Sequence, residues 1–295
     1  MFTKKLGFIG LGLMGSSICR NLIKKNYELI VYDINVKAME KFQGKARIAN
    51  NHIEVYDESP VILLSLPNSN IVEKVLKDFI DLGVKGKIIV DLSTSNPIST
   101  INLHKEIKKQ GGYLIDAPLN AGPEEAEKGQ AISMVAGDKA IINKLDYLFK
   151  SYCKQYNYLG KSGNAHIAKL VMNFLGLMYA ILLCQIFPLT EKLGLDTKEL
   201  FKIMDNEILS NWIFKFYGEK IINANFKIDF KLKHGLKDLI YMKNLYENFN
   251  VPAFTLDGGI DLLRIAFKNG KSELDFSECA NIIKDFLNNC SKEKD

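Results

Sequence analysis

A glycine-rich turn near the amino terminus limits the possible folds more than any other feature of this sequence. Gly10, Gly12 and Gly15 have the spacing GxGxxG, and they follow a short apolar run at residues 4–9 and lead into a helical pattern. A second apolar run comes next, and Asp33 stands twenty-one residues after Gly12. This order of strand, turn, helix, strand and acid predicts a dinucleotide-binding unit.

Each position of the turn has a predicted role. Gly10 permits the tight turn, Gly12 lets the backbone approach a pyrophosphate, and Gly15 lets the helix pack closely on the strand. Leu13 and Met14 lie at the start of the helix, where free amides and the positive end of the helix dipole favour phosphate.

Asp33 bears on the choice of cofactor. Its carboxylate is expected to accept hydrogen bonds from the adenosine ribose hydroxyls and to repel a 2′-phosphate. No arginine occurs among residues 34–37, which favours NAD, while Lys37 leaves NADP open.

Short apolar runs alternate with helical patterns up to about residue 160, as in a parallel sheet that is buried on both faces. They occupy residues 61–66, 87–90, 113–115, 131–136 and 155–159. Ligands bind such sheets at the carboxyl ends of the strands. We therefore expect contacts with the cofactor from Leu66 and Pro67, at the end of the first run, and from Thr94, shortly after the second.

The polar segment that contains Thr94 allows two interpretations. The hydroxyls of Ser93 and Thr94 could bind the nicotinamide ribose. Alternatively, the polar side chains cap a helix that begins at Pro97. The capping candidates are Asp91, Ser95 and Asn96. Both interpretations can hold at once.

The segment after residues 113–115 is a candidate substrate loop. A short helix begins near Gly122, so backbone amides at 120–122 would be free to hold an anion. Glu124 and Glu125 add negative charge to the same helix end, which leaves a capped turn without a ligand as an equal alternative.

A long apolar segment, from Gly163 to Gly194, marks the change from mixed structure to helices alone, and we predict an interdomain helix at 163–193. Lys169 and Asn173 lie four residues apart and share one face of it. The segment is long enough to span a membrane, but polar and helix-breaking residues interrupt it, so we expect no membrane association. A lysine that only extends to the surface is the other alternative.

Two domains are expected from this change of pattern. Residues 1–161 should form an α/β Rossmann domain with a doubly wound sheet, and residues 162–295 an all-α domain for substrate binding and oligomerisation. Trp212 and the aromatic residues near it are expected in the core of the second domain.

Composition excludes several functions. The net charge is +5, but only three of the 39 basic residues are arginines and no basic run contains aromatic residues, so nucleic-acid binding is not expected. The four histidines lack metal-site spacing. The cysteines have no CxxC pairs and fit free thiols in a reducing cytoplasm. They are Cys19, Cys153, Cys184, Cys279 and Cys290.

Taken in order, these motifs resemble the 3-hydroxyisobutyrate dehydrogenase-like family of β-hydroxyacid dehydrogenases, which includes tartronate semialdehyde and succinic semialdehyde reductases. The resemblance covers nearly the whole chain. The five matching motifs are FIGLGLMG at 8–15, DLST at 91–94, the loop that starts with DAP at 116–118, the glycines, lysine and asparagine within 160–173, and the phenylalanine and LKDL within 230–239.

The resemblance implies a homodimer or homotetramer and NAD(P)-linked interconversion of a short β-hydroxyacid and its semialdehyde. It implies that Lys169 is the general acid/base and that Asn173 fixes the geometry of the lysine and the substrate. Lys237 would line the nicotinamide end of the cofactor, and Phe230 would contact the substrate. Asp238 is expected to point elsewhere and only to support closure over the nicotinamide.

Departures from the family pattern affect the substrate. Asn120, Ala121 and Gly122 replace the Ser-Gly-Gly that binds a carboxylate in the family, and Ala165 and Met172 replace a usual glycine and a frequent asparagine. These changes leave two alternatives open. The chain could reduce a non-carboxylate carbonyl or imine, or it could bind a dinucleotide without catalysis.

Overall fold

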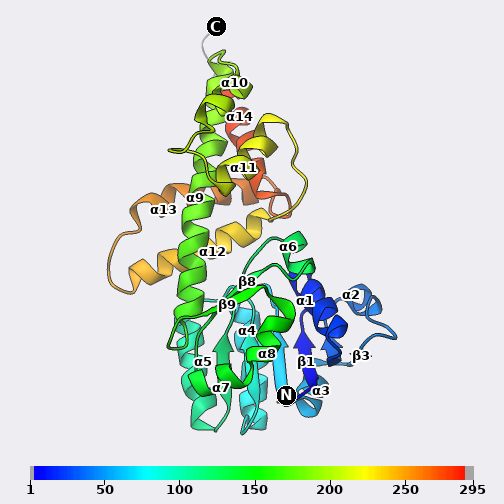
Figure 1. Ribbon diagram of the computed structural model, residues 1–295. Coiled ribbons are helices and arrows are strands. Elements are labelled where there is room, and N and C mark those ends of the chain that lie inside the picture. Colours follow the sequence, from blue (N-terminus) through cyan, green and yellow to red (C-terminus); the bar gives the residue numbers. More distant parts are fainter. Residues whose placement is uncertain (1–2, 290–295) are drawn as a thin grey trace. The chain divides into compact units, whose positions relative to one another are not determined.

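The computed structural model describes residues 3–289 and contains two compact units (Figure 1). Contacts divide the chain after Lys169, inside a long helix. The domain limits expected from the sequence, 1–161 and 162–295, stay a prediction. The predicted fold class is confirmed, because a doubly wound α/β unit is followed by a helical one.

A six-stranded parallel sheet forms the centre of the first unit. The strand order β3-β2-β1-β4-β5-β6 is that of a doubly wound dinucleotide-binding sheet. The strands are β1 (Lys5–Ile9), β2 (Glu28–Tyr32), β3 (Arg47–Ile48), β4 (Val61–Leu64), β5 (Ile88–Asp91) and β6 (Tyr113–Asp116).

Burial of both sheet faces explains why the strands are continuous apolar runs. In β4, Val61 and Leu63 belong to one core cluster, and Ile62 and Leu64 belong to another. Successive side chains of a strand point to opposite faces, so both faces need apolar residues. The helices that follow the strands are α1 (Leu13–Lys24), α2 (Val36–Glu40), α3 (His52–Glu58), α4 (Ser69–Leu82) and α5 (Pro97–Lys109).

Three strands form a second sheet, so the prediction that the runs at 131–136 and 155–159 complete the main sheet is wrong. β7 (Leu119–Asn120) pairs antiparallel with β8 (Ile132–Val135), which pairs parallel with β9 (Gln155–Tyr158). An isolated bridge joins Asp116 of β6 to Ala136. An apolar run indicates a strand but does not specify its neighbour.

Short helices accompany this second sheet. α6 (Pro123–Glu127) follows β7 and begins at the predicted place. The sequence pattern predicts one helix at residues 138–150, but the structure has two there, α7 (Lys139–Lys144) and α8 (Asp146–Tyr152). Asp138 caps α7 by accepting hydrogen bonds from two backbone amides.

Helices alone form the second unit, apart from one isolated bridge between residues 231 and 275 among its described residues. α9 agrees with the predicted interdomain helix, and its last turns pack on the core of this unit through Phe187. The helices are α9 (Asn164–Lys192), α10 (Thr197–Met204), α11 (Trp212–Ile222), α12 (Leu232–Glu247), α13 (Phe254–Lys268), the short 3-10 helix η1 (Phe276–Glu278) and α14 (Cys279–Asn289).

Two predictions in this unit are wrong. The sequence pattern predicts a helix that is capped by Asp196 and continues to Leu209, but this helix, α10, ends at Met204. Trp212 is 60% exposed and stacks on Phe216, instead of lying in the core. α11 buries the face that carries Phe214, Tyr217 and Ile221, and Trp212 lies outside that stripe.

α9 is the one described helix that is long and apolar enough to cross a membrane. Only 39% of its most apolar window is buried within the structure. Core helices of soluble proteins pass the same test of length and composition, so this finding is weak evidence for a membrane span.

Candidate active site

The turn between β1 and α1 fits a dinucleotide pyrophosphate. Gly10 has a φ of +97°, and a Cβ there would lie 2.2 Å from the carbonyl oxygen of Ser65. A Cβ at Gly15 would lie 2.0 Å from the carbonyl oxygen of Gly10, so α1 packs directly on the turn. At Gly12, a Cβ would meet no described atom within 4 Å, and α1 has no side-chain cap. Open space and uncapped amides together suit phosphate binding.

Asp33 stands beside this turn, at the carboxyl end of β2. One carboxylate oxygen accepts a hydrogen bond from the amide of Leu11 at 2.5 Å, and the other accepts one from the amide of Asn35 at 2.7 Å. These bonds fix the carboxylate next to the glycine turn. The position fits hydrogen bonding to an adenosine ribose.

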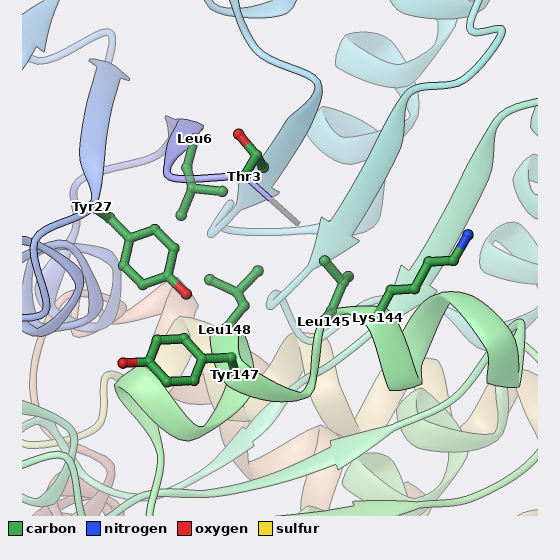
Figure 2. A pocket seen from close by; sticks show the side chains of 7 residues that line it. All are labelled: Thr3, Leu6, Tyr27, Lys144, Leu145, Tyr147 and Leu148. Carbon is green, nitrogen blue, oxygen red and sulfur yellow. The ribbon is translucent and has the colours of Figure 1, made fainter. Parts of the chain in front are cut away.

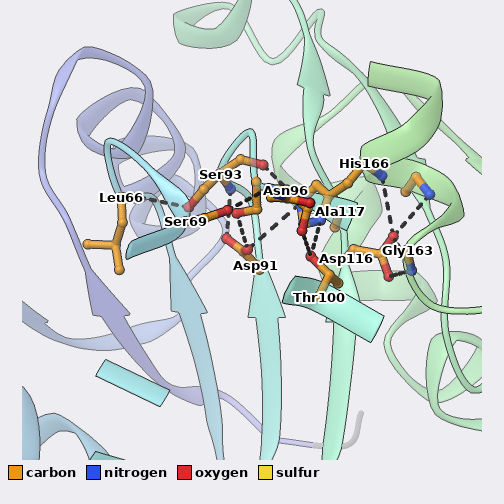
Figure 3. Close-up of polar contacts among 12 residues, drawn as sticks. Leu66, Ser69, Asp91, Ser93, Asn96, Thr100, Asp116, Ala117, Gly163 and His166 are labelled. Carbon is orange, nitrogen blue, oxygen red and sulfur yellow. Dashed lines mark hydrogen bonds and ion pairs between the residues drawn. The ribbon is translucent and has the colours of Figure 1, made fainter. Parts of the chain in front are cut away.

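The loops after β4 and β5 are joined by hydrogen bonds (Figure 3). The amide of Leu66 donates to Ser93 Oγ at 2.9 Å, and the amide of Asn96 donates to Ser69 Oγ at 2.5 Å. Ser93 Oγ thus holds the neighbouring loop. Thr94, which is half-buried, lies in the same turn and remains the candidate for a nicotinamide ribose.

The capping interpretation of this turn is confirmed in part. Asn96 caps α5 by accepting a hydrogen bond from the amide of Ile98. Asp91 does not cap α5. Its two oxygens accept hydrogen bonds from the amide of Ser93 and the hydroxyl of Ser95, so it shapes the turn itself.

Two buried residues that sequence reasoning missed hold the start of α9. Asp116, at the end of β6, accepts hydrogen bonds from the amides of Gly163 and Ala165, each at 3.0 Å, and from Ser162 Oγ at 3.1 Å. His166, fully buried, contacts the loop after β5. Figure 3 shows Asp116 at the carboxyl end of β6 and His166 close to the carboxyl end of the neighbouring strand β5. Their partners lie 46 to 73 residues away, so no local spacing revealed them.

Lys169, half-buried, is three residues beyond His166 on α9. Asn173 follows one turn later, and its Nδ2 donates a hydrogen bond to Asp238 Oδ2 at 2.7 Å. Asp238 is 3% exposed, and its other oxygen lies 2.8 Å from Lys237 Nζ. The expectation that Asp238 points away from the site residues is therefore wrong, because it contacts two of them. Adjacent helix residues usually diverge, and the length of the lysine side chain overcomes this.

The loop at residues 120–122 follows β7. Asn120 is exposed, Ala121 is half-buried, and Gly122 is the N-cap of α6 without a side-chain cap. A Cβ at Gly122 would lie 2.7 Å from Glu125 Oε2, so this carboxylate lies against the loop. Contacts from α1 support α6: Asn21 Nδ2 donates to the carbonyl of residue 126, at 2.8 Å.

Phe230 precedes α12 and packs against the core of the second unit. Its ring packs against His234 and Phe276, and its amide donates a hydrogen bond to Asp275. Burial lowers the pKa of His234, and the neighbouring charge of Lys237 lowers it further.

Two pockets lie away from the carboxyl ends of the strands. The first, near the amino ends of β1 and β2, has a volume of about 20 Å³ and room for one water molecule (Figure 2). Its lining residues are Thr3, Leu6, Tyr27, Lys144, Leu145, Tyr147 and Leu148. The second, of about 310 Å³, lies in the helical unit, where apolar residues of α9 and α13 line most of it.

Within residues 3–289, no group of three or more His, Cys, Asp or Glu side chains is placed to hold a metal ion. Four cysteines in that range are buried free thiols, and Cys290 lies outside the described residues. Burial raises the pKa of the Cys153 thiol to about 11.

Two family models match the chain. The NAD-binding domain of 6-phosphogluconate dehydrogenase matches residues 5–160, more than half of the chain. The NAD-binding domain of NADP-dependent 3-hydroxyisobutyrate dehydrogenase matches residues 163–283.

Sequence similarity to named proteins covers nearly the whole chain. Glyoxylate/succinic semialdehyde reductase 2 of Arabidopsis thaliana is 29% identical, across 96% of this chain and 80% of its own length. The 2-hydroxy-3-oxopropionate reductase of Escherichia coli K12 is also 29% identical, across 92% of this chain and 94% of its own length. Mycobacterium tuberculosis 3-hydroxyisobutyrate dehydrogenase, solved with L-serine, has the same fold, with a TM-score of 0.86 and 21% identity over 96% of this chain and 99% of its own.

Proposed function

Because this chain belongs to the NAD(P)-binding 3-hydroxyisobutyrate dehydrogenase-like family of β-hydroxyacid dehydrogenases, we propose that it interconverts a short β-hydroxyacid and its semialdehyde. The observation that carries the proposal is the arrangement on α9. Lys169 and Asn173 lie one turn apart, and buried Asp238 holds the Asn173 amide. Relatives named as semialdehyde and 2-hydroxy-3-oxopropionate reductases support the substrate class.

Lys169 is the proposed general acid/base. When bound, the nicotinamide ring gives a hydride to the substrate carbon or takes one from it. In reduction, the Lys169 ammonium donates a proton to the carbonyl oxygen, and in oxidation the amine accepts the hydroxyl proton. For this role, the Lys169 nitrogen must lie within hydrogen-bond distance of the substrate oxygen.

The hydrogen bond to Asp238 fixes the orientation of the Asn173 side-chain amide. A carboxylate oxygen only accepts hydrogen bonds, so the contact with Asp238 uses the Asn173 amide nitrogen. The Asn173 carbonyl oxygen is then the group that can accept a hydrogen bond from the Lys169 ammonium or a substrate hydroxyl. We propose that Asn173 orients the proton donor in this way, with Lys237 at the nicotinamide end of the cofactor.

The loop at 120–122 supports a second candidate function, reduction of a non-carboxylate carbonyl or an imine. Ala121 adds a methyl group where the family has glycine, and the carboxylate of Glu125 lies against Gly122. A carboxylate repels a substrate of the same charge. A neutral or cationic substrate would avoid this repulsion.

Cofactor preference, assembly and location complete the proposal. Asp33 beside the glycine turn favours NAD over NADP. We also propose a homodimer or homotetramer in the cytoplasm that acts on a small molecule.

A substrate panel tests the proposal. Oxidation of NADH and NADPH is followed with succinic semialdehyde, methylmalonate semialdehyde, tartronate semialdehyde, glyoxylate, neutral aldehydes and imines. Turnover of a carboxylated semialdehyde supports the first function, and turnover of neutral substrates alone supports the second. If the chain binds cofactor tightly but turns over nothing in the panel, it is a binding protein without this catalysis.

Replacement of the lysine tests its role. We expect Lys169→Ala to lower kcat by about 100- to 10,000-fold, the range for loss of a general acid/base, with little change in the Kd for NADH. Lys161→Ala removes an exposed lysine just before α9 and serves as the control. A Lys169→Ala enzyme with near-normal kcat would refute the assignment.

A further inference from the structure

A buried histidine joins the loop after β5 to the first turn of α9 (Figure 3). His166 is 0% exposed. Its Nε2 lies 3.0 Å from the carbonyl oxygen of Ser93, and its Nδ1 lies 2.8 Å from Thr100 Oγ1. Asp91 Oδ2 is 3.7 Å from Nε2. All of these residues belong to the first unit.

The partners define which ring nitrogen carries a hydrogen. The Ser93 carbonyl only accepts, so Nε2 must donate to it. Thr100 Oγ1 lies closer to Nδ1, at 2.8 Å, than to the carbonyl oxygen of Asn96, at 3.2 Å, and its one hydrogen can be donated to Nδ1. Both ring nitrogens then have a partner, and an apolar side chain at this position could make neither bond.

The two elements that His166 joins carry two proposed functional groups. Thr94 follows Ser93 directly, and Lys169 lies three residues after His166 on the same helix. Asp116 also holds α9, through the amides of Gly163 and Ala165 and the hydroxyl of Ser162, and it pairs with Asp91 at the end of β5. His166 adds a side-chain contact from α9 to the loop after β5 itself.

We propose that His166 is a positioning residue, which sets the loop carrying Thr94, and with it the nicotinamide ribose, relative to the turn of α9 that carries Lys169. The inference rests on the proposed roles of Thr94 and Lys169. His166 itself touches neither substrate nor cofactor in this scheme. Its effect on the reaction is exerted through the two elements it joins.

Three substitutions separate the two hydrogen bonds. His166→Leu removes both. His166→Gln places an amide nitrogen near the position of Nε2 and can keep the bond to Ser93, whereas His166→Asn reaches only toward Thr100. His104→Gln is the matched control, because His104 lies on α5 and its ring contacts the carbonyl of residue 114 in β6, not the loop after β5.

The affinities for two ligands distinguish a loss of positioning from a general loss of structure. NADH contains the nicotinamide ribose, whereas ADP lacks both the nicotinamide and its ribose but keeps the adenosine and the two phosphates expected at Asp33 and the glycine turn. Binding is measured by titration of fluorescence or heat, well below each variant's Tm. We expect His166→Leu to raise the Kd for NADH by about fivefold or more and to change the Kd for ADP by less than about twofold, since one or two lost hydrogen bonds shift affinity on that order.

Catalysis gives the second readout. We expect His166→Leu to lower kcat by about tenfold or more with a smaller change in the substrate KM, as for a misplaced reacting group. His166→Gln should recover most of the NADH affinity and kcat, and His166→Asn should not. His104→Gln should behave as the wild type in both measurements.

Equal weakening of NADH and ADP binding, or a lower Tm with wild-type kcat and NADH affinity, would reduce His166 to a packing residue and overturn the proposal. So would a Gln variant as impaired as the Leu variant. Failure of the proposed function is a separate result, because the wild-type chain would then turn over no substrate in the panel. The comparison of NADH with ADP would still decide the role of His166.

Discussion

Gly12 and Gly15 stand three residues apart, yet alanine should affect them differently. The backbone at Gly12 has φ −63° and ψ −168°, which alanine can adopt, and a Cβ there meets no described atom within 4 Å. A Cβ at Gly15 would press on the carbonyl of Gly10. Gly12→Ala should therefore keep the wild-type Tm but raise the Kd for NADH about tenfold or more, because the methyl group occupies the space suited to a phosphate.

Gly15→Ala should instead lower the free energy of unfolding by about 1–3 kcal/mol, the usual cost of overpacking. Thermal unfolding and NADH titration of both variants measure the contrast. Wild-type NADH affinity in Gly12→Ala would show that the pyrophosphate does not approach this residue.

Residues with local signals were predictable from the sequence. The glycine turn and Asp33 could be found because their spacing along the chain sets their spacing in the fold. Asp238 was misjudged because its contacts depend on how α12 packs beside Asn173, 65 residues earlier. Asp116 and His166 were not singled out for the same reason, since a buried polar side chain has no signature until its distant partner is known.

At the scale of elements, Arg20 and Glu127 join α1 to α6, the helix that directly follows the predicted substrate loop. Arg20 Nε donates to both oxygens of Glu127, at 2.8 and 2.9 Å. This hydrogen bonding holds the pKa of Glu127 at about 2, below its usual 4.5. The unfolded chain takes up the proton first as the pH falls, so the pair stabilises the fold above about pH 4.5 and loses that effect between about pH 4.5 and 2.

Glu127→Gln should lower the free energy of unfolding at pH 7 by no more than about 1 kcal/mol, because both side chains are 39% exposed and solvent screens the pair. The difference from wild type should persist to about pH 5 and shrink below it. Urea unfolding between pH 7 and pH 3.5 measures this, with Glu124→Gln on the same helix as control. A difference that grows toward low pH would contradict the assignment.

Elements were predictable where burial alone decides their form. α9 and the parallel strands with long apolar runs were expected at nearly their observed limits, because such runs leave few alternatives, whereas the two-residue strand β3 was not expected. Strand pairing was not, and β8 and β9 were assigned to the wrong sheet for that reason. The break at Leu145 between α7 and α8 was missed, because no proline or glycine marks it.

For the whole molecule, the exposed side of α9 bears on assembly. Leu175, Leu182 and Leu189 are 66%, 50% and 45% exposed, at seven-residue spacing, and no charged residue occurs at 170–190. Such spacing suits packing against a second helix with the same repeat. A second copy of α9 provides one, in agreement with the proposed homo-oligomer.

Light scattering should therefore give two or four times the chain mass of 33.3 kDa without detergent. Leu182→Glu should shift the protein toward the monomer, because it places a charge in the apolar contact. Lys198→Glu, an exposed change on α10, is the control. Recovery of the wild type only in the membrane fraction would favour a spanning α9 instead.

The predicted substrate loop and the predicted cofactor-binding residues follow strands of two different sheets. The loop at 120–122 leaves β7 of the three-stranded sheet, whereas the glycine turn, Asp33 and Thr94 all follow strands of the six-stranded sheet. Substitutions in the loop can therefore leave the glycine turn unchanged. Under the proposed function, substitutions in this loop should change the preferred substrate while the chain keeps its cofactor affinity.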